Sequence, residues 1–199
     1  MRRCVGLCLA GLLLAAGTAW AVDIGVGAFG GPSFTVLQQD AQRGSTYGVR
    51  VPVKMIPILT VEPYLALYKM GEGKQTVEGY GDVTRSAFDG TTFGANVILG
   101  SPLGGGFKFY PFAGIGTNKL TRDGSADISD VGYTFGLGLD LGLVSNLSLT
   151  ARGELNMVTT GDTSRKFANA TVGLTYQLFQ SGGGPPLAGP ATQPPRRQP

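Results

Sequence analysis

Acidic and basic side chains occupy polar positions in short segments of this chain in which apolar residues alternate with polar or small ones. Side chains that alternate in this way lie on one face of a β-strand. Carboxylates and basic groups gathered on one face form ion pairs, and in a closed space their rearrangement can also open a path for ions. The residues concerned are Asp23, Arg50, Lys54, Glu62, Lys108, Asp140, Arg152 and Glu154.

Other chemistry is limited by the residue types that are missing. The sequence contains no histidine, and its two cysteines, Cys4 and Cys8, lie close to the N-terminus. Without histidine there is no imidazole base, no Ser-His-Asp triad of the common kind and almost no possibility of a His-ligated zinc or iron site. We therefore predict that the protein is not an enzyme and that it has no catalytic residues, metal site or cofactor.

Three further signals are weak. Gly25–Gly30 matches the G-x-G-x-x-G string of dinucleotide sites, but no helical pattern follows it. The acidic segment Asp123–Asp130 could hold calcium, yet its spacing does not match an EF-hand, so a solvated loop is the favoured interpretation. Lys and Arg number 16 against 13 Asp and Glu and form no cluster, so we predict no nucleic-acid partner.

The segment Val131–Leu143 shows the alternation that positions these charges most clearly. Large apolar residues occupy its odd positions, and glycine, threonine and a single aspartate occupy its even positions. The exposed face of a soluble sheet would carry Lys, Glu and Thr, whereas the narrow interior of a small membrane barrel favours small and polar side chains. The segment therefore predicts a strand with one face toward lipid and one toward a lumen.

Seven more segments alternate in the same way, near residues 22–30, 47–55, 59–68, 92–99, 107–119, 147–157 and 167–179. Short turns near residues 56–57, 100–105 and 145–146 alternate with longer polar stretches at 31–46, 70–90, 121–129 and 160–165. An even number of strands, with short periplasmic turns and longer external loops, is the topology of outer-membrane barrels. We predict an all-β fold, an eight-stranded antiparallel up-and-down transmembrane β-barrel.

In such a barrel the charged positions face a lumen about wide enough for its own side chains, so opposite charges there must pair. We predict a structural charge network formed by Arg50, Lys54, Glu62, Lys108, Asp140, Arg152 and Glu154. The sharper hypothesis is a gated ion path in which these pairs rearrange.

The two ends of the chain differ from the barrel segment. Residues 1–21 combine Arg2 and Arg3, a short apolar run and a small-x-small ending, which predicts a signal peptide cleaved before Val22. The alternative, a retained anchor, is disfavoured because the run is shorter than the roughly 20 residues that a spanning helix needs. Residues 180–199 contain half of the 12 prolines and are predicted to be a disordered Pro/Gly-rich tail.

On these features the sequence resembles the OmpA-barrel and OmpX-like superfamily of eight-stranded outer-membrane barrels, over roughly Val22–Phe179. The stretch Phe109–Gly116 is similar to a Pro-aromatic-Gly strand common in such barrels. The chain segment with Tyr176, Leu178 and Phe179 resembles the aromatic-ended signal that the barrel assembly machinery recognises. The resemblance implies an outer-membrane location, with membrane lipids, lipopolysaccharide and the assembly machinery as partners.

Three functions remain open at this point. The favoured one is a non-enzymatic barrel that supports envelope integrity or makes surface contacts through its external loops. The alternative is a small pore or conduit for ions or apolar solutes. A soluble periplasmic lipocalin-like binding barrel is less favoured, because it would place the glycines of Val131–Leu143 on an outer surface with no lipid to explain them.

Overall fold

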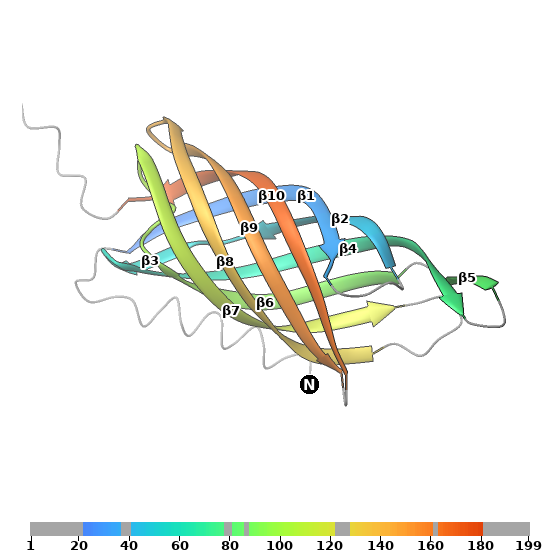
Figure 1. Ribbon diagram of the computed structural model, residues 1–199. Helices are drawn as coiled ribbons and strands as arrows, with labels where there is room; N and C mark the ends of the chain where they lie inside the picture. The colour runs from blue at the N-terminus through green and yellow to red at the C-terminus, as the bar shows by residue number, and fades with distance from the viewer. Residues whose placement is uncertain are drawn as a thin grey trace, which may run out of the picture.

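The computed structural model describes residues 22–36, 41–77, 81–85, 88–121, 128–160 and 163–180, so the predicted signal peptide and nearly all of the predicted tail lie outside the described residues. The described chain forms an antiparallel barrel (Figure 1). Its strands are β1 Asp23–Thr35, β2 Ala41–Arg50, β3 Val53–Ile56, β4 Leu59–Val77, β5 Gly81–Arg85, β6 Phe88–Leu99, β7 Phe107–Thr121, β8 Ile128–Val144, β9 Leu147–Thr160 and β10 Thr163–Phe179.

The sheet closes on itself with eight positions around its circumference. Its order is β10-β9-β8-β7-β6-β4-β2-β1, and β1 pairs with β10 to complete the ring. β3 continues β2, because both pair with β1 on one side and with β4 on the other. Among the described strands, β5 pairs with the far end of β4 alone. The predicted eight-stranded antiparallel barrel is therefore confirmed.

The interruption between β2 and β3 falls at Val51 and Pro52. Proline has no N–H to give to a ladder, and Pro63 on the facing strand β4 also lacks one. Two hydrogen bonds bridge the gap, from Val51 N to Pro63 O at 2.9 Å and from Gly25 N to Pro52 O at 2.9 Å. The alternation continues across the break, so Arg50, Pro52 and Lys54 all keep their inward positions.

The external end is more regular than the sequence suggested. The stretches 31–46 and 70–90 were expected to be loops, but β1 runs to Thr35, β2 begins at Ala41 and β4 continues to Val77. Beyond the apolar band both faces of a strand meet water, so the apolar–polar alternation that marks a strand disappears from the sequence. In Figure 1 the hairpin of β4 and β5 projects beyond the rest of the barrel.

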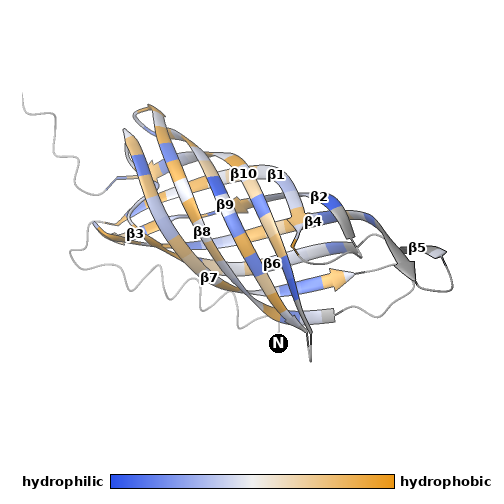
Figure 2. Cartoon of the chain, in the orientation of Figure 1, coloured by the Kyte–Doolittle hydropathy of each residue, from blue (hydrophilic) through white to orange (hydrophobic). Residues whose placement is uncertain are grey.

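Apolar side chains lie on the outside and polar side chains on the inside. Figure 2 shows orange and blue or pale residues alternating along the strands. On β8 the large residues from Val131 to Leu143 are exposed at odd positions, whereas Thr134 and Asp140 are buried. Within the part of the chain described here, no helix is long and apolar enough to cross a membrane. Exposed apolar side chains arranged as a continuous band match a surface in contact with lipid.

Buried side chains occupy much of the interior. Tyr64, Ala66, Tyr68, Met70, Val158 and Phe167 form a cluster toward the external end. Tyr68 and Phe167 pack edge to face there, with ring centroids 5.1 Å apart. A second cluster of Ile98, Tyr110 and Phe112 lies toward the end that carries the short turns, which in outer-membrane barrels is the periplasmic end.

Candidate functional site

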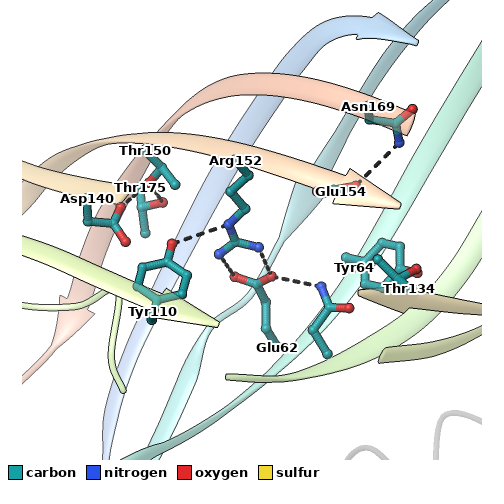
Figure 3. Close-up of polar contacts among 11 residues, drawn as sticks. Glu62, Tyr64, Tyr110, Thr134, Asp140, Thr150, Arg152, Glu154, Asn169 and Thr175 are labelled. Atoms are coloured by element: carbon teal, nitrogen blue, oxygen red, sulfur yellow. Dashed lines mark hydrogen bonds and ion pairs between the residues drawn. The ribbon is translucent and has the colours of Figure 1, made fainter. Parts of the chain in front are cut away.

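The centre of the lumen contains a bidentate ion pair between Arg152 on β9 and Glu62 on β4 (Figure 3). Arg152 Nη1 donates to Glu62 Oε1 at 2.5 Å, and Nη2 donates to Oε2 at 2.8 Å. Three strands, β8, β7 and β6, separate β9 from β4 on one side of the ring, and three positions separate them on the other. The pair therefore spans the full diameter of the barrel.

Neighbouring side chains complete the surroundings of this pair. Arg152 Nε donates to the Tyr110 hydroxyl at 3.3 Å, and its guanidinium carbon lies 4.9 Å from the centroid of the Phe112 ring. Asn96 Nδ2 donates to Glu62 Oε1 at 3.2 Å. Both charged groups are almost fully buried. A buried pair of this kind persists only when its remaining donors and acceptors are also satisfied, and these neighbours meet that condition.

Glycines on β8 make room for the rings that flank Arg152. A Cβ atom at Gly138 would overlap Tyr110 Cε2, and one at Gly136 would overlap Phe112 Cζ. A side chain at either position would force the facing ring to move, so the two glycines leave the space that the rings occupy. The glycine face of Val131–Leu143 thus corresponds to the space that large lumen side chains occupy.

A second arginine, Arg50, lies beside the pair without a comparable partner. It is 2% exposed and its guanidinium carbon lies 5.4 Å from the Phe29 ring centroid. Its Nε and Nη2 atoms have no hydrogen-bond partner among the described residues. Glu154 accepts a hydrogen bond from Asn169 Nδ2 at 3.3 Å. Arg50, Glu62, Arg152 and Glu154 line one small cavity, together with aromatic and polar neighbours.

The other three predicted network residues lie nearer the periplasmic end. Lys54 pairs with Asp23 at 2.9 Å. Lys108 donates to the backbone oxygen of Leu103, in the turn between β6 and β7. Asp140 accepts from Thr150 Oγ1. All seven predicted residues thus occupy inward-facing positions, but the structure divides them into a central group of four and a periplasmic group of three.

Sequence reasoning missed the residues that hold the arginines in place. Tyr110, Phe112 and Asn96 are not among the residues that the sequence analysis assigned to the site. The sequence did indicate their inward position, because Tyr110 and Phe112 lie two and four residues after Lys108 and so share its face of the strand. Leu103 carried no such signal, since it lies in a turn.

Two remaining predicted sites lie at the margins of the structure. Tyr176, Leu178 and Phe179 are exposed on the outer surface at the end of β10, where the assembly signal remains a prediction. The acidic segment 123–130 lies mostly outside the described residues. Among those that are described, no group of three or more His, Cys, Asp or Glu residues is placed to hold a metal ion.

Comparison with known proteins extends these observations. The profile of the outer membrane protein beta-barrel domain family matches residues 4–177. No curated protein matches the sequence.

Three solved structures show the same fold. Neisserial surface protein A is 16% identical, with 78% of this chain and 96% of that chain covered and a TM-score of 0.56. A major outer membrane protein of Thermus thermophilus is 13% identical, with 79% and 99% covered and a TM-score of 0.57. Ail, the attachment invasion locus protein of Yersinia pestis, in complex with the heparin analogue sucrose octasulfate, is 14% identical, with 80% and 99% covered and a TM-score of 0.50.

Proposed function

Because this chain belongs to the outer membrane protein beta-barrel domain family, we propose that it serves the outer membrane as a structural barrel with a closed lumen that makes contacts through its external end. Its location in the outer membrane follows from the family and from the fold it shares with outer membrane proteins. The observation that carries the proposal is the buried Glu62–Arg152 pair, which crosses the lumen from wall to wall. A lumen blocked in this way favours a structural role over transport.

Packing on both sides of the central pair supports the closed state. The aromatic and aliphatic cluster around Tyr68 and Phe167 fills the external half, and Ile98, Tyr110 and Phe112 fill space toward the periplasm. An eight-stranded barrel is about wide enough for its own side chains. The packing of these residues on both sides of the pair supports a lumen without a continuous polar path.

The structure of the external end supports the proposal that the barrel makes contacts there. The hairpin of β4 and β5 extends past the barrel wall (Figure 1), and the backbone groups on the outer edge of β5 face no other described strand. An unpaired strand edge can accept an extended segment of another chain. We further propose that membrane lipids contact the apolar band, with lipopolysaccharide around the external rim and the barrel assembly machinery as the partner during insertion.

A second candidate function, a gated ion path, is favoured by one observation. Arg50 is buried beside Glu62 and Glu154, and two of its nitrogen atoms have no hydrogen-bond partner among the described residues. A cation in this position could replace Arg152 as the partner of Glu62, which would free one side of the lumen.

Channel recording on purified protein in planar bilayers separates the two functions. The sample is first shown to be folded by gel mobility in SDS with and without boiling. The structural proposal predicts a mobility shift on boiling and no steady conductance. Steady conductance from folded protein would replace it with the ion path. A chain that fractionates as soluble, with one unchanged band, would overturn both.

A further inference from the structure

The turn between β6 and β7, residues 100–106, folds into the barrel instead of lying outside it. Leu103 is 3% exposed, and Pro102 is fully buried. Ile58, an apolar residue of similar size in the turn between β3 and β4, is 70% exposed. The turn of residues 100–106 therefore covers the periplasmic mouth of the lumen.

Two glycines in the barrel wall leave the space that this turn occupies. A Cβ atom at Gly25 would lie 2.6 Å from Leu103 Cδ2 and 3.3 Å from Pro52 Cγ. A Cβ atom at Gly142 would lie 2.8 Å from the Cα of Gly105. The turn is thus seated against β1 on one side of the mouth and against β8 on the other.

The base and the tip of the turn are held differently. At the base, Gly100 N donates to Ile58 O and Gly142 N donates to Gly106 O, both at 2.9 Å. At the tip, the Leu103 carbonyl accepts from Lys108 Nζ, a side chain rather than a strand backbone. Gly100 and Gly106 have φ values of 123° and 89°, which only glycine adopts readily, so both ends of the turn are formed by permissive residues.

Lys108 also faces an alternative partner. Asp140 lies directly opposite it in the β7–β8 ladder and is 1% exposed. Asp140 Oδ1 accepts from Thr150, and the Tyr110 hydroxyl faces the carboxylate (Figure 3), but Oδ2 has no hydrogen-bond partner among the described residues. The ammonium thus bonds to a neutral carbonyl while a buried carboxylate oxygen nearby lacks a donor. Such an oxygen gains from a cationic partner.

We propose that residues 100–106 form a displaceable plug, latched by Lys108, that controls the access of small polar molecules from the periplasm to the inward-facing side chains at the mouth of the lumen. On release, Lys108 Nζ leaves the Leu103 carbonyl and pairs with Asp140 Oδ2. Displacement of the turn would expose the buried side chains of Ser148, Thr150 and Asp140, while the Glu62–Arg152 pair would still cross the lumen, so release of the plug would not create a pore. The inference goes beyond the proposed structural function and does not depend on it.

Thiol labelling tests the plug directly. Ser148 lies on β9, is buried, and pairs with Gly142 under the turn. No cysteine occurs in residues 22–199, so Ser148→Cys gives the barrel a single reporter thiol. The rate of modification by a small charged methanethiosulfonate is measured on folded protein, with Asn146→Cys in an exposed turn as the reference for full access. Gel mobility with and without boiling shows that each variant is folded.

Removing the apolar tip is expected to open the mouth. With Leu103→Ala added, we expect Ser148→Cys to react about 10-fold faster, because local opening no longer exposes a buried leucine. Ile58→Ala removes an equally large residue from a turn that stays outside, and we expect it to leave the rate unchanged. Equal rates with and without Leu103→Ala would overturn the plug, as would a rate equal to that of Asn146→Cys in the otherwise unaltered protein.

If Lys108 exchanges the Leu103 carbonyl for Asp140, substitutions of Lys108 and of Asp140 should change the labelling rate in opposite directions. Lys108→Met removes the donor that holds the tip, so labelling should accelerate. Asp140→Asn keeps an oxygen that can accept from Thr150, but it removes the carboxylate charge with which Lys108 would pair after release. The open state is then less favourable, so labelling should slow. A residue with a merely structural role would loosen the mouth when changed. Faster labelling in Asp140→Asn, or an unchanged labelling rate in Lys108→Met, would overturn the proposal that Lys108 moves from the Leu103 carbonyl to Asp140.

Discussion

At the scale of single residues, the Glu62–Arg152 pair is the most consequential contact in the lumen. Arg152→Met leaves the buried Glu62 carboxylate without its cation, and losing one partner of a buried pair typically costs about 3–5 kcal/mol. The double variant with Glu62→Gln should recover part of that loss, because no uncompensated charge remains. Urea unfolding followed by gel mobility in detergent measures both.

The matched control for this prediction is the pair of Lys54 and Asp23, in which the lysine side chain is 26% exposed. Lys54→Met should cost at most about 1 kcal/mol, since solvent screens a partly exposed pair. If Arg152→Met proved as mild as Lys54→Met, the central pair would not be what holds the lumen closed.

The glycines of β8 make a second prediction at this scale. Gly138→Ala places a methyl group in the space that the Tyr110 ring occupies, and overpacking of this kind costs about 1–3 kcal/mol. Gly153→Ala is the control, because its Cβ would meet nothing within 4 Å. Unfolding titrations should separate the two, and equal stability would show that the ring can move away freely.

The alternation of apolar and polar residues along the strands identified which side chains face the lumen, but it could not show which of them form ion pairs with one another. Positions such as Arg50 and Arg152 are equivalent in the sequence, since both are inward-facing arginines on alternating strands. Which of them pairs with Glu62 depends on where β4, β2 and β9 stand around the ring, and on the volume that Tyr110 and Phe112 occupy. These are properties of the closed barrel, and no local pattern contains them.

At the scale of elements, β8 was predictable nearly to its ends, because one of its faces meets lipid and the other meets side chains. The outer part of β4, with β5, was not predictable, because neither face there has to be apolar. The inward turn at residues 100–106 was also missed. A turn rich in Gly, Ser and Pro is usually solvated, and a single leucine within it gives little indication that the turn enters the lumen.

The hairpin of β4 and β5 gives a prediction for a whole element. Deleting residues 73–85 removes β5 and the part of β4 that pairs with it, and it breaks no other ladder between the described strands. The shortened chain should still insert and still shift in mobility on boiling. Deleting Val53–Ile56, which pairs with both β1 and β4, should abolish folding. If the barrel failed to fold without residues 73–85, the hairpin would be part of the folding unit and not an appended contact element.

At the scale of the whole molecule, apolar side chains lie on the outer surface and polar side chains lie inside, the reverse of a soluble protein. The effect of a surface substitution on stability therefore depends on whether lipid or water surrounds the barrel. Leu137 lies near the middle of β8, is 53% exposed and packs against no core. In water, replacing such a residue with arginine changes stability little, whereas at the midplane of a bilayer Leu137→Arg should cost about 2–4 kcal/mol. The loss should appear in unfolding from lipid bilayers.

A charge placed outside the apolar band provides the comparison. Asn146→Arg, in the exposed turn between β8 and β9, should leave stability within about 0.5 kcal/mol, because arginine there remains in water or at the headgroup level. Equal effects of the two substitutions would mean that lipid does not surround the apolar band. A large loss at Leu137 alone would follow directly from the depth at which β8 crosses the membrane, since the cost of a lipid-facing arginine rises from the interface to the midplane.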